Sequence, residues 1–274
     1  MEAGKLYICP TPIGNLGDIT LRTIEILKTA DIIAAEDTRH TKILLNHLGI
    51  RKQLTSYHEH NIREKGELLI EILSNGKSVA LVSDAGMPGI SDPGEDLVRL
   101  AIESGIEVIG LPGASALITA LVISGLPAAR FAFEGFLPSK SSDRKKTLNT
   151  LKDEQRTIIF YESPHRIVET LADMEDILGD RKISLSRELT KKFEETIRGN
   201  LSDVLKEAQS RELKGEFVIV VEGAKIKKED YDIESMLREL VAEGHTKKDA
   251  IKMVSEATGT PKNEVYAISL KIGK

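Results

Sequence analysis

The chain has 274 residues, of which 41% are hydrophobic and 30% charged, and its formal net charge at pH 7 is −5. This is an ordinary globular composition with room for two principal domains, and the negative charge argues against non-specific coating of nucleic acid, although a local basic patch can still bind RNA. No apolar run is long enough to span a bilayer, and the first ten residues lack the basic and apolar regions of a secretion signal, so we expect a cytoplasmic protein that does not enter a membrane.

Strand-length apolar runs alternate with segments of helical period in the first part of the chain. Strands are expected at 5–10, 31–36, 78–83 and 107–111, with helices near 20–30, 39–48, 61–74 and 94–104. The only cysteine, Cys9, lies in the first strand and has no partner for an intramolecular disulfide, which agrees with a reducing compartment. The alternation predicts an α/β domain over residues 1–113.

The pattern changes after a further helix expected near 115–124. More closely spaced strands are expected at 131–136, 157–162, 182–188, 195–199 and 216–222, with helices near 143–152, 164–178 and 201–210. This crowding predicts a mixed sheet in a second α/β domain, residues 114–224. Two such domains should enclose a cleft between them.

The remaining residues, 225–274, are predicted to form a linker and a small helical tail. A polar, lysine-rich stretch over 224–233 precedes three short amphipathic segments, the last opening with Pro261 at an expected first helical position. By direct count the tail has ten Lys and Arg against nine Asp and Glu, a net charge of +1, whereas the rest of the chain has 28 against 34, a net charge of −6. A helix-turn-helix that contacts nucleic acid and a small bundle that packs on the main body both fit this pattern.

Two loops after expected strands have the backbone freedom that ligand sites need. The loop LVSDAGMPGISDPG, residues 81–94, is rich in glycine and proline, and LPGASA, residues 111–116, opens a helix with small residues. Ligands bind at the carboxyl ends of strands in α/β sheets, where Asp84 could accept hydrogen bonds from a ligand ammonium or hydroxyl group. The alternative is an aspartate turn followed by a helix that starts near residue 92. Neither a dinucleotide-binding fingerprint nor a phosphate-binding P-loop is present in the first turn, CPTPIGNLGDIT, where Thr20 is expected to cap a helix.

Eight segments, in this order, closely resemble one family: PTPIGNLGDIT, AAEDTRHT, SYHEHN, LVSDAGMPGISDPG, LPGASA, FYESPHR, RELTKKFEE and GEFVIVVEG. The family is that of the small-subunit ribosomal RNA methyltransferases I, in the tetrapyrrole methylase fold superfamily, and the resemblance covers residues 5 to 273. It implies two α/β domains of the tetrapyrrole methylase (class III methyltransferase) type with a cleft between them, plus the small C-terminal helical domain. It also implies a homodimer that uses S-adenosylmethionine to methylate the ribose 2′-hydroxyl of a cytidine in 16S ribosomal RNA, within the 30S subunit.

The resemblance also assigns residues to the cofactor. Those expected to contact S-adenosylmethionine are Pro12, Ile13, Asp84, Met87, Ser115 and Ala116, with Tyr161 in the second domain. No metal is expected.

The segment AAEDTRHT offers candidates for catalysis, because a ribose hydroxyl is a poor nucleophile and a general base is typically worth ~10²–10⁴-fold. Asp37 or Glu36 is expected to accept the hydroxyl proton or to orient the hydroxyl, and Arg39 to hold an RNA phosphate. In the alternative interpretation Asp37 or Thr38 caps the next helix while Glu36 pairs with Arg39.

Further RNA contacts are expected from two segments. In SYHEHN, His58 and His60 point the same way if the segment stays extended, and the basic segment near residue 140 contributes Lys140, Lys145 and Lys146. A solvated face is the alternative for both. In FYESPHR, Ser163 and Pro164 are expected at the start of a helix.

Two other functions remain open. The same fold could methylate a tetrapyrrole or another small molecule, and a protein that keeps the cofactor pocket could bind RNA without catalysis. The segments AAEDTRHT and SYHEHN and the helical tail favour the ribosomal RNA enzyme.

Overall fold

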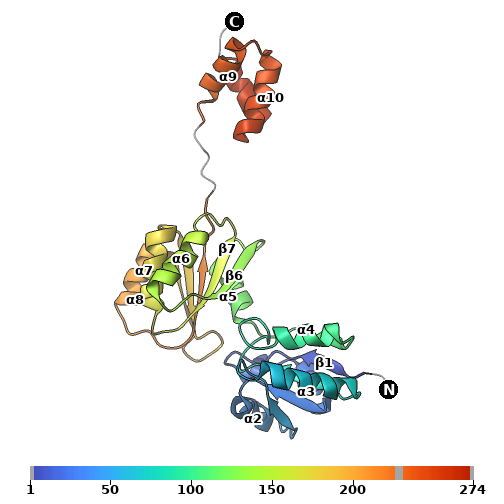
Figure 1. Cartoon of the computed structure of the whole chain (residues 1–274). Coiled ribbons are helices and arrows are strands. Elements are labelled where there is room, and N and C mark those ends of the chain that lie inside the picture. The colour runs from blue at the N-terminus through green and yellow to red at the C-terminus, as the bar shows by residue number, and fades with distance from the viewer. Residues whose placement is uncertain (1–2, 226–230, 272–274) are drawn as a thin grey trace. The chain divides into compact units, whose positions relative to one another are not determined.

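The structure is a computed structural model that describes residues 3–225 and 231–271. It divides into two compact units, residues 1–224 and 225–274 (Figure 1). The first unit holds two β-sheets and the second is helical, so the predicted fold class is confirmed.

The first sheet is wholly parallel, with strand order β3-β2-β4-β1-β5. Its strands are β1 (Lys5–Ile8), β2 (Ile32–Ala35), β3 (Leu54–Ser56), β4 (Val79–Val82) and β5 (Glu107–Gly110). The helices that connect them are α1 (Leu21–Thr29), α2 (Thr38–His47), α3 (Ile62–Ser74) and α4 (Glu95–Glu103). The central strands β2 and β4 are buried along their whole length, as expected for parallel strands covered on both faces.

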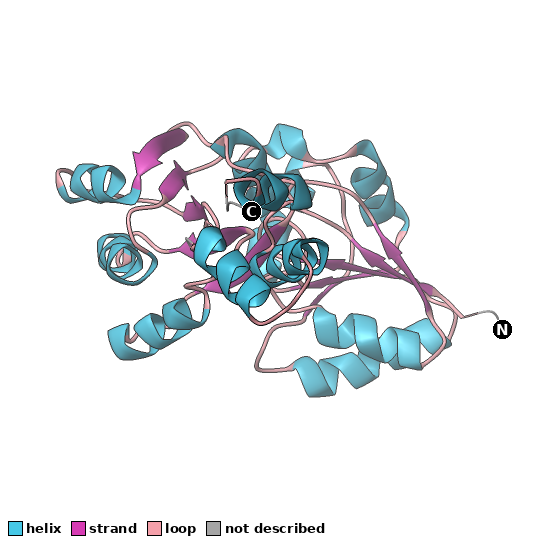
Figure 2. Cartoon of the chain, turned by 90° about the horizontal axis from the view of Figure 1, so that it is seen from above, coloured by secondary structure: helices cyan, strands magenta, loops and turns pink. Residues whose placement is uncertain are grey.

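Helices cover both faces of this sheet (Figure 2). Leu69 of α3 and Leu97 of α4 belong to the core on one face, and Leu27 of α1 and Leu45 of α2 to the core on the other. Cys9 is part of the second core and is wholly buried, and this burial raises the pKa of its thiol to about 12. Thr20 caps α1 by accepting a hydrogen bond from the backbone N–H of Thr23 at 3.1 Å, as the sequence predicts.

The second sheet is mixed, as predicted, with strand order β6-β7-β10-β8-β9. Its strands are β6 (Phe131–Phe136), β7 (Thr157–Glu162), β8 (Lys182–Arg187), β9 (Glu195–Asn200) and β10 (Phe217–Val221). Only the β6–β7 pair is parallel among the described pairings of this sheet. Helix α5 (Ala116–Ser124) covers one face, and α6 (Ser141–Thr150), α7 (Ile167–Leu178) and α8 (Leu201–Gln209) cover the other.

Helix α7 begins later than the sequence suggests. The expected start at Ser163 and Pro164 is wrong, because the helix begins at Ile167 with Arg166 at the N-cap position. Residues 163–166 instead form a turn, in which the buried carboxylate of Glu162 accepts a hydrogen bond from the backbone N–H of Ser163 at 2.7 Å. The Glu162 carboxylate thus holds the backbone of this turn, and α7 has no side-chain cap at its N-terminus.

The second unit contains three short helices in its described part. They are α9 (Ile233–Ala242), α10 (Lys247–Thr258) and α11 (Lys262–Ser269). Their apolar faces share a small core built around Leu237, Ala250, Val254 and Val265. Pro261 lies at the N-cap of α11, one position before the expected one. Among the described helices of the whole chain, none has the length and apolar character needed to cross a membrane.

Candidate functional site

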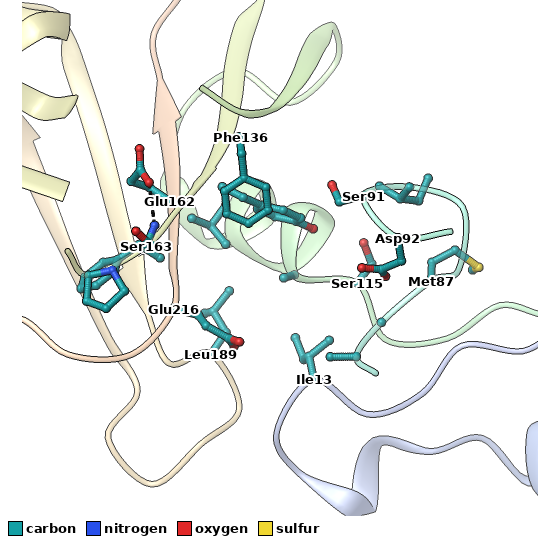
Figure 3. Close-up of a pocket in the computed structure, with 18 residues that line it drawn as sticks. Ile13, Met87, Ser91, Asp92, Ser115, Phe136, Glu162, Ser163, Leu189 and Glu216 are labelled. Atoms are coloured by element: carbon teal, nitrogen blue, oxygen red, sulfur yellow. Dashed lines mark hydrogen bonds between the residues drawn. The ribbon is translucent and has the colours of Figure 1, made fainter. Parts of the chain in front are cut away.

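A cavity of about 370 Å³ lies in the first unit and is lined by residues from both sheets (Figure 3). Its volume falls within the range of roughly 300–1,000 Å³ that small-molecule sites occupy. From the first-sheet side come Ile13 and the loop 85–92, and from the second-sheet side the ends of β6 and β7, the loop after β8 and the start of β10. The residues at the start of α5 complete the wall. The predicted cleft between two α/β domains thus contains a cavity whose volume is large enough for a ligand such as a nucleoside.

The glycine-rich loop after β4 forms one wall because it can fold back on itself. Gly94 has a φ of +156°, and a Cβ atom there would lie 3.0 Å from the backbone nitrogen of Gly89. The same loop pairs with the first turn: the backbone N–H of Thr11 donates to the Gly86 carbonyl at 2.9 Å, and that of Gly86 donates to the Thr11 carbonyl at 3.0 Å. Backbone freedom at this strand end therefore serves to bring two loops together around the cavity.

Five of the seven residues predicted to contact the cofactor line this cavity: Ile13, Met87, Ser115, Ala116 and Tyr161. The hydroxyl oxygen of Tyr161 accepts a hydrogen bond from the backbone N–H of Leu117 at 3.2 Å, so it stabilises the first turn of α5. Ser115 precedes that helix but does not cap it with its side chain. Its hydroxyl is therefore not used to satisfy the helix N-terminus.

Asp84 and Pro12, the other two predicted cofactor residues, are not among the residues that line the cavity. The Asp84 carboxylate turns toward the AAEDTRHT segment, where it accepts a hydrogen bond from the backbone N–H of Asp37 at 3.1 Å and lies 3.2 Å from Nδ1 of His40. Asp37, His40 and Asp84 each offer a potential ligand atom within 4.8 Å of the others. The Asp37 carboxylate, however, is already occupied by the guanidinium of Arg39.

The two predicted catalytic carboxylates have different environments. Asp37 accepts hydrogen bonds from the Arg39 side chain, the shortest at 2.6 Å, and from its backbone N–H at 2.8 Å, and these contacts hold the pKa of Asp37 well below its usual range. Asp37 is thus the N-cap of α2, and Arg39 pairs with Asp37 rather than with Glu36 as the alternative interpretation had it. Burial, and to a smaller extent the nearby charge of Asp92, raise the pKa of Glu36.

Asp92 lines the cavity and was not predicted from the sequence. Its pKa is raised, mainly by burial, while a hydrogen bond from the Ser83 side chain acts in the opposite direction. Figure 3 places Asp92 near Ser115 and Met87, on the first-sheet side of the cavity. A carboxylate with a raised pKa in a pocket is typical of a group that exchanges protons.

A second carboxylate of the cavity wall is Glu162 at the end of β7, which the sequence had already indicated, with Arg166, as able to face the cleft. Its side chain is fully buried and accepts hydrogen bonds from Arg166 at 2.7 Å and from the Thr170 hydroxyl at 2.7 Å. Arg166 in turn donates to the carbonyl of Leu137, at 3.2 Å, just after β6. This network fixes the wall of the cavity formed by the ends of β6 and β7.

The residues predicted to contact RNA lie in different settings. Arg39 is highly exposed, with 89% of its side chain accessible. His58 and His60 lie in a turn rather than in an extended segment, so the expected strand geometry is wrong, although their rings are in edge contact with centroids 5.9 Å apart. Lys145 is paired with Asp176 at 2.9 Å, whereas Lys140 and Lys146 are exposed near the start of α6. The RNA contacts themselves stay predictions.

Comparison with known proteins identifies relatives for both units. Residues 5–205 match the family described as Tetrapyrrole (Corrin/Porphyrin) Methylases, and residues 228–273 match the RsmI C-terminal HTH domain. The chain is 50% identical to ribosomal RNA small subunit methyltransferase I of Halalkalibacterium halodurans, covering 97% of this chain and 95% of the relative. It is 49% identical to the protein of that name from Escherichia coli O157:H7, over 98% of this chain and 95% of the relative.

Among solved structures the similarity is one of fold. The uroporphyrin-III C-methyltransferase of Thermus thermophilus, complexed with S-adenosyl homocysteine, is 19% identical with a TM-score of 0.55, over 80% of this chain and 97% of that one. A diphthine synthase is 17% identical with a TM-score of 0.60, over 80% of this chain and 90% of that one.

Proposed function

Because this chain belongs to the tetrapyrrole methylase family, and within it to the family of ribosomal RNA small subunit methyltransferase I, we propose that it methylates the ribose 2′-hydroxyl of a cytidine in 16S ribosomal RNA, with S-adenosylmethionine as methyl donor. The observation that carries this proposal is the identity of about half of all residues to the ribosomal RNA enzymes over nearly the whole chain, the helical tail included. A tetrapyrrole acceptor is disfavoured because similarity to those enzymes is low and covers only about four-fifths of the chain.

The cavity fits S-adenosylmethionine. Its volume suits a nucleoside joined to an amino acid, the side chains of Ile13 and Met87 offer apolar contact, and Ser115 offers a hydroxyl that is not spent on a helix cap. When bound, the cofactor supplies an electrophilic methyl group on a sulfonium centre. The chain's own contribution is to hold donor and acceptor in line and to exclude water, and such alignment can account for much of a rate enhancement.

Asp92 is the carboxylate best placed to accept the hydroxyl proton. A general base must reach the cavity and must have a pKa closer to neutrality than that of an ordinary carboxylate, and Asp92 meets both conditions. Asp37 meets neither, since Arg39 lowers its pKa and makes it a weak base. Asp37 therefore suits the role of orienting Arg39 toward an RNA phosphate. Glu36 suits the role of a nearby carboxylate whose charge influences the electrostatics of the site.

We further propose that the enzyme acts as a homodimer on the assembled 30S subunit in the cytoplasm. Helix α5 supports the proposal of a homodimer. The helix is apolar all around, yet its outer face leaves Ile118 and Val122 exposed, Val122 by 71%. A second copy of the chain would cover such a face.

The test is transfer of labelled methyl from S-adenosylmethionine to purified small ribosomal subunits that lack this modification, followed by nuclease digestion and identification of the labelled nucleoside. We expect a 2′-O-methylated cytidine, and no label when S-adenosylhomocysteine is present in excess. An absence of label in the RNA, together with tight cofactor binding, would overturn the proposal and direct the search to tetrapyrrole acceptors and then to a non-catalytic role.

A further inference from the structure

A β-bulge turns one aromatic side chain of β6 toward the cavity. In the parallel β6–β7 pair, Phe133 lies opposite Ile159 and Phe136 lies opposite Tyr161, so three steps along β6 span two steps along β7. The extra residue is accommodated near Gly135, whose φ of +64° is a conformation that favours glycine. Since side chains alternate along a strand, an unbroken β6 would direct Phe133 and Phe136 to opposite faces, and the bulge directs them to the same face.

The result is a cluster of three aromatic rings that leads from the core to the mouth of the cavity. The ring of Tyr161 contacts that of Phe133 edge-on, with centroids 4.9 Å apart, and that of Phe136 edge-on, at 5.6 Å. Phe133 and Tyr161 are half-buried, whereas Phe136 is 55% exposed and still lines the cavity. Phe136 is therefore the outermost ring, on the opposite side of the cavity from Ser91 and Asp92 (Figure 3).

The ring of Phe136 is held by its surroundings. The next residue, Leu137, is buried, and its carbonyl accepts a hydrogen bond from the Arg166 guanidinium at 3.2 Å. The ring of Tyr161, which contacts that of Phe136, is itself held by the hydrogen bond that its hydroxyl accepts from the backbone N–H of Leu117. An exposed aromatic face that is already held in place loses little conformational freedom when a ligand stacks on it.

We propose that Phe136 stacks on the base of the target nucleotide, and so holds the ribose of that nucleotide at the cavity beside Asp92. This inference rests on the proposed function. A ribose whose 2′-hydroxyl enters the cavity must leave its own base close to the mouth, and single-stranded or extruded bases are commonly bound by stacking on aromatic side chains. The flat, uncharged ring of Phe136 at the mouth can stack on the face of a base. The Asp92 carboxylate across the cavity can accept a hydrogen bond from the ribose 2′-hydroxyl.

The test compares three variants of the full chain in methyl transfer to unmethylated small ribosomal subunits. Phe136→Leu keeps apolar volume but removes the ring, Phe136→Tyr keeps the ring, and Phe131→Leu is the matched control, since Phe131 is also exposed on β6 but does not line the cavity. Stacking of one base is worth ~1–3 kcal/mol, which corresponds to roughly 5- to 150-fold in affinity. We expect Phe136→Leu to raise KM for the subunits by that factor, with the Kd of S-adenosylmethionine measured by calorimetry unchanged. Phe136→Tyr should raise KM much less than Phe136→Leu because it keeps the ring, and Phe131→Leu should behave as wild type.

Three results would overturn the inference while the wild-type enzyme still methylates the subunits. They are an unaltered KM in Phe136→Leu, an equal rise in Phe131→Leu, or a rise in Phe136→Leu that accompanies dissociation of a dimer in sedimentation, which would make Phe136 a subunit contact. Failure of the wild-type enzyme to methylate the subunits would instead refute the proposed function, and the stacking role with it.

Discussion

Arg166 neutralises a carboxylate that has no access to water. Removing the charge of Arg166 should therefore lower the free energy of unfolding considerably. The Glu162 side chain is fully buried, and Arg166 approaches it with two nitrogens, at 2.7 and 3.0 Å. We therefore choose Arg166→Met, which keeps the length and apolar stem of the side chain but removes the charge, as the most informative perturbation of the cavity wall.

The expected loss follows from the contacts that remain. Removing one partner of a buried ion pair typically costs about 3–5 kcal/mol, because the other charge is left uncompensated. The backbone N–H of Ser163 and the hydroxyl of Thr170 still donate to Glu162, which favours the lower end of that range, while the Leu137 carbonyl loses a donor worth about 1 kcal/mol. We expect the free energy of unfolding to fall by about 3–4 kcal/mol. The double variant Glu162→Gln/Arg166→Met should lose less than Arg166→Met alone, because no charge is left buried.

Urea unfolding followed by circular dichroism would measure these differences in the free energy of unfolding. The dependence of that free energy on urea concentration should be the same in all variants, since a change would indicate an altered folded or unfolded state. Arg156→Met is the matched control, since Arg156 pairs with Glu154 at the surface and such exposed pairs contribute little to stability. The reasoning would be refuted by a loss below about 1 kcal/mol in Arg166→Met, or by a double variant that is at least as unstable as Arg166→Met.

Further predictions concern methyl transfer and the binding of ribosomal subunits. Asp92→Asn should lower methyl transfer by about 10²-fold or more and leave the Kd of S-adenosylmethionine in calorimetry nearly unchanged. Because a base must be deprotonated, the wild-type rate should fall as the pH drops through the raised pKa of Asp92. If Asp92→Asn still shows this fall in rate at low pH, Asp92 is not the base. Asp37→Ala should leave cofactor affinity nearly intact while methyl transfer falls, since Arg39 loses its orienting partner; an unimpaired rate would remove Asp37 from the reaction. Deletion of residues 226–274 should weaken binding of ribosomal subunits, measured by filter retention, more than cofactor binding, whereas equal losses would mean that the tail supports folding instead.

Local signals in the sequence were sufficient for the elements and for one side of the cavity. Period and glycine position predict the α/β alternation, and backbone freedom after β4 together with the family resemblance leads to Ile13, Met87 and Ser115, which line the cavity. The three residues themselves come from the family resemblance, because the local pattern indicates only a loop with a permissive backbone and not which side chains contact a ligand.

The residues that were missed depend on geometry that no short pattern encodes. Asp84 and Asp92 belong to one loop, and the sequence favoured Asp84 because it directly follows the strand. The loop instead turns Asp84 toward the backbone of Asp37 and places Asp92 in the cavity. Phe136 was not predicted: a strict period of two would place it on the face away from Phe133, and only the bulge brings both rings to one face.

The deep burial of Cys9 has a practical consequence for chemical labelling. Thiolate is the reactive form of cysteine, and the only thiol of this chain is inaccessible and has a pKa near 12, so thiol-directed reagents at neutral pH should leave the folded protein unmodified. The chain can therefore serve as a cysteine-free background without any substitution. A single cysteine introduced at Ser91, on the exposed rim of the cavity, would be the one reactive position, and the rate at which it is alkylated would report occupancy of the cavity directly.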